Sequence, residues 1–388
     1  MIKKIFITVF ILVALVTSAS AGELISREHP YFYKSPRAMG MGGAYVAIGG
    51  SADTLFYNPA GLSNLPEDEG WEYNVLNLSG ELSDNALDII NDMQDAFDLG
   101  DVDGDGDDSD DQLAEMVEIL AKYRGDNTHL DISAFGSLGK KSGKVAFAFG
   151  GIGTARADSI AHQGLGSNGL FDVNAQAHYG GLGGFSYEAS EGLSLGAAVK
   201  FFHRESLTET FTAQELIDNQ DTLEDYLLED LRQSGNALGI DAGLIYHIPR
   251  LASLKPSVGL SVMNIGDMDF GDAGKMPMSV NVGLSLNPDI PAFEYLLIGL
   301  DYVDLFNNFE QDSDAGKRLR FGGELSIVDK KLIGLAVRAG LYQGYATGGV
   351  DVRLSVVTLS YVTYAEEVGA YAGQDDDRRH LAMINVGW

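Results

Sequence analysis

The sequence contains no cysteine among its 388 residues. A chain without thiols forms no disulfides, thiolate zinc sites, Fe–S clusters, cysteine nucleophiles or lipidated N-terminal cysteine. The seven histidines are scattered and never fall at the H-x-x-H or H-E-x-x-H spacing of a metal site. The sequence therefore gives no indication of metal chemistry on cysteine or histidine, and we expect no cofactor built on them.

Positive charge is also scarce. The chain has 26 Lys and Arg against 56 Asp and Glu, for a net charge of −30. Binding to a phosphate backbone needs a basic surface, so nucleic acid is excluded as a partner. The hydrophobic content of 45% is too high for a disordered acidic chain, which predicts a folded protein.

Long hydrophobic runs are absent after the first 20 residues. Lys3 and Lys4 precede 12 apolar residues, Ile5 to Val16, and Ala19-Ser20-Ala21 has the small-residue pattern of a cleavage site. This pattern predicts a cleaved export signal at 1–21, since a membrane anchor needs about 20 apolar residues. No later segment has 18 uninterrupted apolar residues, so the exported protein either stays soluble or crosses a membrane as strands.

What the sequence has instead is alternation. In segments such as 193–201, 280–286 and 319–327, apolar residues take every second position, and glycine or polar residues take the others. Period-2 alternation gives a strand one apolar face and one polar face. It predicts 14 strands, at 71–81, 129–138, 144–153, 174–189, 192–205, 236–248, 255–265, 278–287, 294–305, 317–328, 332–343, 345–353, 356–365 and 378–388.

The expected connections alternate in length. Links after even-numbered strands are short, whereas those after odd-numbered strands are long, at 82–128, 154–173, 206–235, 266–277, 306–316 and 366–377; only the link near Gly344 is an exception. Short turns at one end and long loops at the other are typical of an outer-membrane barrel. The prediction is an all-β, 14-stranded antiparallel transmembrane β-barrel over 71–388, with a soluble exported β-protein as the weaker alternative.

Charged residues occupy the polar face of several strands. If the apolar positions face lipid, these residues point into the lumen: Asp131, Lys200, Asp241, Asp301, Arg320, Glu324, Arg338, Asp351 and Arg353. Both signs of charge are present. One interpretation is that they pair with each other or with a plug, and the other is that they line a path for substrate or ions.

Two long loops contain helical patterns. Helices are expected on both sides of 101–112, a segment that matches a calcium-binding EF-hand loop through Asp101, Asp103, Asp105, Asp107 and Ser109. Gln112 stands where that loop needs a bidentate glutamate, so a Ca²⁺ site would be weak, and a solvated acidic loop is the alternative. The 206–235 insertion is expected to hold a third helix, begun by the capping box Thr212-x-x-Glu215.

Two enzyme motifs match the sequence, but neither occurs in the structural context that its chemistry requires. Gly192 to Gly196 fits G-x-S-x-G around Ser194, but it lies inside an alternating strand and not on a strand-to-helix turn. Gly164 to Gly169 fits G-x-G-x-x-G, but no helix follows it. No catalytic residues are predicted, and the protein is not expected to be an enzyme.

The segment before the first strand is the most specific part of the chain. It contains a glycine-rich run with Gly40, Gly42 and Gly43, followed by Asn58-Pro59-Ala60. This pattern resembles the FadL-type outer-membrane barrels, a superfamily of long-chain fatty-acid transporters, and the related PorV-like and TraF-like barrels of secretion and conjugation systems. The resemblance implies an N-terminal hatch over 22–70, inside a 14-stranded barrel whose helical insertions lie in extracellular loops at 82–128 and 206–235. It also implies that Trp388, the terminal aromatic residue, is read by the barrel-assembly machinery.

Two functions are consistent with these features. The first is passive transport of small hydrophobic compounds, fatty-acid-like or aromatic, across the outer membrane of a Gram-negative-type bacterium; its partners are membrane lipid and a hydrophobic ligand. The second is a scaffold or accessory barrel of a secretion or conjugation apparatus. Large acidic loops favour the second, since segment 82–128 alone has 15 acidic and two basic residues.

Overall fold

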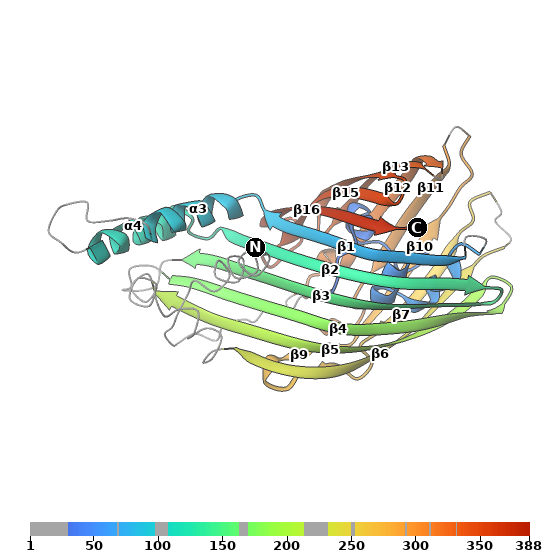
Figure 1. Cartoon of the computed structure of the whole chain (residues 1–388), viewed down its shortest axis with the longest axis horizontal. Coiled ribbons are helices and arrows are strands. Elements are labelled where there is room, and N and C mark those ends of the chain that lie inside the picture. The colour runs from blue at the N-terminus through green and yellow to red at the C-terminus, as the bar shows by residue number, and fades with distance from the viewer. Residues whose placement is uncertain are drawn as a thin grey trace.

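The fold is a closed antiparallel barrel, seen here in a computed structural model (Figure 1). The structure describes residues 30–67, 70–97, 108–162, 170–212, 232–249, 253–291, 293–309, 312–330 and 332–388. The expected signal at 1–21, the ligands Asp101 to Asp107 of the calcium loop and most of the expected third helix lie outside these residues.

Fourteen strands form the wall, in the ring order β1-β16-β15-β14-β13-β12-β11-β10-β7-β6-β5-β4-β3-β2. Their bounds are β1 Trp71–Ser83, β2 Asn127–Ser142, β3 Val145–His162, β4 Leu170–Ser190, β5 Leu193–Thr212, β6 Gln233–His247, β7 Ser257–Met263, β10 Ser279–Leu286, β11 Tyr295–Tyr302, β12 Leu319–Lys330, β13 Ile333–Tyr342, β14 Tyr345–Leu354, β15 Val357–Glu367 and β16 Asp376–Gly387. The predicted number and order of strands are therefore confirmed.

The outer face of the wall is apolar. Phe149, Phe185, Val199, Phe201 and Leu238 are each at least 50% exposed, and they point away from the lumen. Successive strand residues alternate between faces, so their polar and glycine neighbours point inward. An apolar band around a closed barrel is stable only in lipid. The protein is an outer-membrane barrel that crosses the membrane with its strands.

The connections separate the barrel into two ends. The link between β2 and β3 and the link between β4 and β5 are tight turns at the short-turn end, which in such barrels faces the periplasm. At the other, long-loop end, Gln343 and Gly344 form the exceptional short link, and both have left-handed φ angles of 52° and 97°. Two successive positive φ angles are typical of a tight hairpin turn.

The long-loop end carries the remaining elements. The helices α3 (Ala86–Phe97) and α4 (Asp108–Lys122) pack together and project beyond the strands (Figure 1). A small hairpin of β8 (Met268–Asp269) and β9 (Lys275–Met276) follows β7. In the described part of the chain, no helix is long and apolar enough to cross a membrane.

Several expected loops are partly strand, two of them over seven or more residues. Residues 154–162 belong to β3 and 206–212 belong to β5, so these loops are shorter than predicted and the third helix does not begin before 213. The extension of β3 has alternating polar and small residues, such as Arg156 and Ala157. Their weak apolar contrast hid the strand, because this part of the wall has no lipid-facing band.

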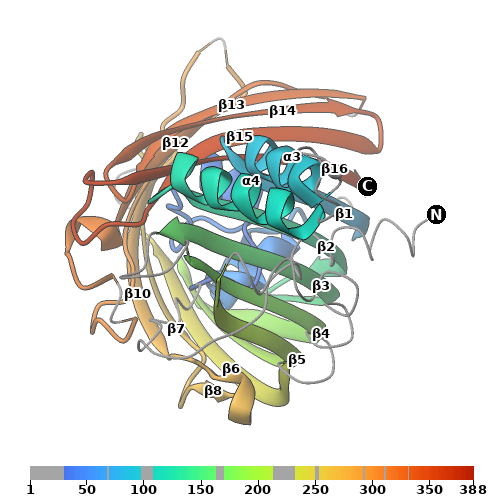
Figure 2. The same ribbon diagram turned by 90° about the vertical axis from the view of Figure 1, so that its left-hand side faces the viewer.

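Residues 30–67, here called the hatch, lie inside the ring of strands (Figure 2). The hatch contains the short helix α2 (Pro36–Gly40) and two 3-10 helices, η1 (Ala52–Phe56) and η2 (Pro59–Asn64). Its aromatic side chains form the core of the molecule together with residues of the wall. Phe56 and Tyr33, for example, both contact Phe135 of β2, with ring centroids 5.2 Å and 5.3 Å apart.

The barrel closes between β1 and β16. The backbone of Trp388 exchanges two hydrogen bonds with Tyr73, of 2.8 Å and 2.9 Å, and the two rings stack with centroids 5.3 Å apart.

Replacing Trp388 by Ala removes this ring contact and leaves the backbone bonds in place. We expect a loss of about 1 kcal/mol in unfolding free energy, the usual value of an aromatic pair. The measurement is urea unfolding of the purified barrel, together with the amount of folded protein in the membrane. Trp388→Phe serves as the control and should behave like the wild type; equal losses in both variants would contradict the assignment to ring stacking.

Candidate functional site

The hatch touches most of the wall through glycine. Nine neighbouring strands, β4 to β14 in ring order, each contribute one inward-facing glycine at which an added Cβ would meet the hatch: Gly184, Gly196, Gly243, Gly259, Gly283, Gly299, Gly322, Gly340 and Gly349. We call these residues the glycine belt. Several are cross-strand neighbours, including Gly196 with Gly243 and Gly299 with Gly322.

The belt brings the hatch backbone against the wall. An added Cβ at Gly340 would lie 2.7 Å from the Gly42 nitrogen, and one at Gly349 would lie 3.3 Å from the Gly40 Cα. Gly42 and Gly43 themselves have left-handed φ angles of 65° and 80°, which turn the hatch along the wall. Side chains at these belt positions would push the hatch inward.

Asn58, Pro59 and Ala60 fix the hatch to the same wall. Asn58 caps η2 by accepting a hydrogen bond from the Ala60 nitrogen at 3.1 Å. Its amide group donates to the Val46 carbonyl at 2.7 Å and to the Leu244 carbonyl of β6 at 3.2 Å. Pro59 and Ala60 pack against Gly196 of β5. The motif thus joins two turns of the hatch to the wall.

Two of the expected lumen residues bind the hatch directly. Asp301 accepts hydrogen bonds from the backbone nitrogens of Tyr45 and Val46, at 2.6 Å and 2.7 Å. Glu324 forms a salt bridge of 2.8 Å with Arg37 and accepts a hydrogen bond of 2.7 Å from the Tyr295 hydroxyl. Both carboxylates are buried.

The other expected lumen residues pair mainly within the wall. Lys200 lies 3.0 Å from Asp241, Arg338 bonds to both Glu324 and Asp351, and the Arg320 guanidinium stacks on Tyr342 at 4.0 Å. Asp131 lies 3.2 Å from Arg156. Arg353 differs, because it is half exposed at the short-turn rim, where it pairs with Asp329. These contacts are those expected of charges that pair with each other and with a plug.

A second buried charged group was not expected from the sequence. Lys34 of the hatch contacts Glu81 at 2.9 Å, Glu366 at 3.3 Å and the Tyr364 hydroxyl at 2.6 Å. The group extends through three further side chains of β2, β3 and β16, namely His129, Asp158 and Arg379. The sequence analysis places Asp158 and Glu366 in loops, so it does not bring this group together.

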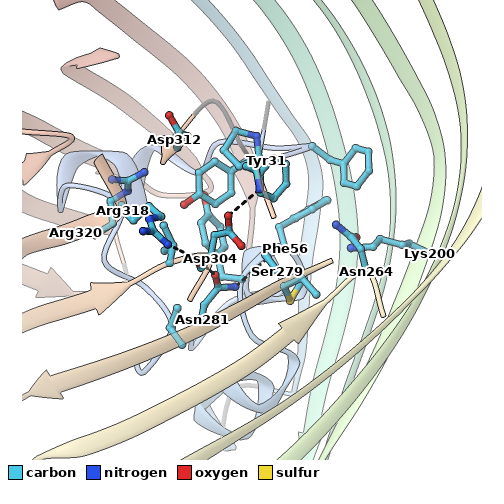
Figure 3. Close-up of a pocket in the computed structure, with 18 residues that line it drawn as sticks. Tyr31, Phe56, Lys200, Asn264, Ser279, Asn281, Asp304, Asp312, Arg318 and Arg320 are labelled. Carbon is cyan, nitrogen blue, oxygen red and sulfur yellow. Dashed lines mark hydrogen bonds between the residues drawn. The ribbon is translucent and has the colours of Figure 1, made fainter. Parts of the chain in front are cut away.

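Two cavities lie on opposite sides of the hatch. The first, the outer cavity, is a space of about 40 Å³ at the long-loop end (Figure 3). Hatch residues Tyr31, Phe32, Phe56 and Tyr57 form one side, and the ends of β7, β10, β11 and β12 form the other. A buried water needs roughly 10–15 Å³ of such space, so this cavity is closed to anything much larger than a few waters.

The second cavity, the vestibule, is an open space of about 790 Å³ at the short-turn end. It is lined by residues 47–50 of the hatch and by turn residues that include Pro249 and Pro256. The hatch is therefore the barrier between a small aromatic-lined space outside and a large open one inside.

No curated protein and no protein-family model matches the chain in sequence. Among solved structures, the Ralstonia pickettii toluene transporter TbuX is 14% identical, with a TM-score of 0.51 over 91% of this chain and 97% of TbuX. The P. putida toluene transporter TodX is 11% identical with a TM-score of 0.43, over 94% of this chain and 97% of its own. A FadL homologue of Pseudomonas aeruginosa is 10% identical with a TM-score of 0.39, over 93% and 99%.

At these low sequence identities the comparison bears on the fold alone. Of the three structures, TbuX supports it, since its TM-score is above 0.5. The chain shares its fold with TbuX, so the barrel fold expected from the resemblance to FadL-type barrels is confirmed. The resemblance to PorV-like and TraF-like barrels stays a prediction.

Close packing at the glycine belt predicts that two nearby glycines differ in how much stability they lose on replacement by alanine. Gly340→Ala places a methyl group 2.6 Å from the Phe321 carbonyl and 2.7 Å from the Gly42 nitrogen, whereas Gly348→Ala on β14 meets no atom within 4 Å. Overpacking should lower the unfolding free energy of the first variant by about 1–3 kcal/mol, and the second should match the wild type. Urea unfolding measures both, and equal stability would argue against close packing of the hatch.

The buried carboxyl of Asp53 in the hatch predicts that the stability of the protein depends on pH. Burial raises the pKa of the Asp53 carboxyl above its usual range, and the hydrogen bond from Ser35 and the nearby Arg37 only partly oppose this rise. The folded state then holds the proton more strongly than the unfolded state, so the contribution of Asp53 to stability falls as pH rises through the raised pKa. The thermal midpoint of the wild type, relative to Asp53→Asn, should decline with rising pH over this window. A constant difference between the two proteins would contradict the shift.

Proposed function

We propose that the protein is a passive outer-membrane channel for small hydrophobic compounds and that the hatch is its gate. The observation that carries this proposal is the pair of cavities on opposite sides of the hatch. One is lined by aromatic rings on the outer side, and the other opens toward the periplasm. A compound that enters the first, which must widen from about 40 Å³ to hold it, then needs a displacement of the hatch to reach the second.

The aromatic side of the outer cavity, formed mainly by the hatch, supports an apolar ligand, whereas the opposite side is polar and includes Asp304, Arg318 and Arg320. Phe32, Phe56 and Phe309 line the cavity, and ring stacking on such side chains favours flat or aliphatic compounds. The structural neighbour TbuX is a toluene transporter, which agrees with this ligand class. Ser194 lies within β5 and not on a strand-to-helix turn, so the G-x-S-x-G string does not form a nucleophile turn.

A scaffold role is the other candidate. Its basis was the acidic, helical loop at 82–128, which would offer a surface to a partner protein. In the described part of α3 and α4, however, the apolar residues pack against each other and against β3, β4 and β5, and Leu87 is the one large apolar side chain left exposed. These two helices thus leave little apolar surface for a partner, and we favour transport.

A disulfide between hatch and wall tests whether the hatch must move for transport. It can be placed specifically, because the chain has no native cysteine. A Cβ added at Gly299 of β11 would lie 3.0 Å from the Ala44 Cβ of the hatch. This lies about 0.5 Å below the short end of the usual Cβ separation in a disulfide, about 3.5–4.5 Å, so Ala44→Cys with Gly299→Cys should form one after a small outward shift of the hatch backbone. In proteoliposomes, the oxidised variant should take up radiolabelled toluene about tenfold more slowly than the wild type, a change of about 1.4 kcal/mol in the barrier, and reduction should restore uptake.

The matched control places the bond within the wall. Gly139→Cys with Ala148→Cys joins β2 to β3 at register partners, where the added Cβ lies 3.4 Å from the Ala148 Cβ. Its oxidation should leave uptake unchanged. Undiminished uptake through the oxidised hatch-to-wall variant would refute a hatch that must move.

A further inference from the structure

A histidine lies at the centre of the buried charged group around Lys34. His129 of β2 is 0% exposed, and each of its ring nitrogens lies beside a carboxylate. Its Nδ1 is 2.7 Å from Asp158 of β3, and its Nε2 is 2.9 Å from Glu81 of β1. A neutral imidazole has one N–H and one lone pair, so it can donate to only one of the two carboxylates. These two contacts are therefore those of a protonated ring that donates on both sides.

The charge balance of the group also favours a proton on this ring. We give the name Lys34 group to Lys34, Glu81, His129, Asp158, Tyr364, Glu366, Asp377 and Arg379, which are joined by contacts and are all buried. Four carboxylates face one lysine and one arginine, so the net charge is −2 with a neutral His129 and −1 with a protonated one. The neighbouring Asp131 and Arg156 lie 3.2 Å apart and add no net charge. Unbalanced charge is costly away from water, and the proton reduces it.

The Lys34 group fastens the first part of the hatch. Besides its contact with His129, Glu81 accepts hydrogen bonds from the Lys34 ammonium at 2.9 Å and from the Tyr364 hydroxyl at 2.6 Å. Lys34 comes directly after the segment that includes Tyr31 and Phe32, which form part of the aromatic side of the outer cavity. The position of Lys34 therefore determines where this side of the cavity lies.

Loss of the proton would change the contacts of Glu81. A neutral ring presents a lone pair to one of the two carboxylates at less than 3 Å, and the two repel each other. Asp158 is held in addition by Arg379 at 3.2 Å, whereas Arg379 is 3.7 Å from Glu81. Beside Glu81 lies a space of about 10 Å³, close to the room that one water needs. Glu81 is thus the carboxylate that can move, and Lys34 moves with it.

We propose that His129 is a pH-dependent switch on the hatch. The protonated ring fixes Glu81 and Lys34 and keeps the outer cavity closed, and loss of the proton releases the segment from Tyr31 to Lys34. The fixed state binds a proton that the released state gives up, so the hold on the hatch weakens as pH rises. The proposal rests on the transport function proposed above and adds its regulation: the channel opens more readily at alkaline pH.

A single tryptophan in the hatch tests the release without any transport assay. Tyr31→Trp is placed in a Trp71→Phe, Trp388→Phe background, to which Asp53→Asn is added so that the Asp53 carboxyl does not titrate. Quenching of its fluorescence by acrylamide, which is neutral at every pH used, should rise about twofold between about pH 6 and about pH 9, where an imidazolium loses its proton. Quenching that does not change with pH overturns the switch.

Two substitutions of His129 separate a switch from a purely structural role. His129→Lys in the reporter protein keeps a positive charge between the two carboxylates, so quenching should stay low at both pH values. His129→Gln has no proton to lose and cannot neutralise the pair, so quenching should be high at both. Equal quenching in these two variants, or the original pH dependence in either, refutes the proposal.

His203→Gln is the matched control. His203 lies on β5, its side chain is 21% exposed, and its nearest carboxylate is Glu205 at 3.7 Å. The pH dependence of quenching should remain in this variant. Its loss would assign the effect to histidines in general and not to His129.

Uptake of radiolabelled toluene by proteoliposomes tests the regulation itself, because toluene has no group that titrates. Uptake through the protein with His129 should be about threefold faster at about pH 9 than at about pH 6, a change of about 0.7 kcal/mol in the barrier. Uptake through His129→Lys should be slow at both. Equal pH dependence in the two proteins overturns the regulation.

The hatch-to-wall disulfide distinguishes failure of the switch from failure of the transport function. If oxidation of Ala44→Cys with Gly299→Cys slows uptake while quenching does not depend on His129, the channel is real and the switch is wrong. If quenching depends on His129 as expected but oxidation leaves uptake unchanged, the hatch responds to pH and the proposed transport through it fails.

Discussion

Close approach of the hatch backbone to the glycine belt is the constraint on which the rest of the structure depends. Nine strands present a position without a side chain at the level of the hatch, so that the hatch lies against the wall at backbone distance. At this distance Asn58, Asp301 and Glu324 can each form a polar contact between the hatch and the wall, because the hatch backbone lies close to the strands. A wall with side chains at these positions would hold the hatch several ångströms further in, and these polar contacts would not form. Glycine content in this chain is thus a requirement for packing the plug.

The charges of the lumen follow from the same arrangement. A carboxylate inside a membrane barrel is costly unless it is paired or hydrogen-bonded. Asp301 meets this requirement with two backbone nitrogens of the hatch, and Glu324 meets it with two guanidinium groups and a hydroxyl. Both depend on the hatch, so any movement that opens the lumen must leave these groups to water or to other partners. An opening of the hatch, as proposed above, would therefore be coupled to the pairing of these lumen charges.

Much of the wall was predictable from the sequence, because lipid on one side and the hatch on the other impose a period of two along each strand. Segment 193–201 shows this pattern clearly and lies within β5. The pattern weakens toward the long-loop end, where small residues such as Ala155 and Ala157 alternate with polar ones, and the extensions of β3 and β5 were missed for that reason. Asp301 and Glu324 were identified as lumen residues, but their hatch partners depend on contacts between segments more than 250 residues apart. The group around Lys34 was missed because Asp158 and Glu366 lay in expected loops.

The position of the belt also bears on how the molecule is built. The belt lies on β4 to β14, while the closing pair of strands, β1 and β16, lies on the opposite side and meets the hatch through the ion pair of Lys34 with Glu81, beside which Arg379 lies 3.7 Å from Glu81. Most of the wall therefore holds the hatch by close packing at glycine positions, whereas the seam that closes the barrel holds it by the buried ion pair of Lys34 and Glu81.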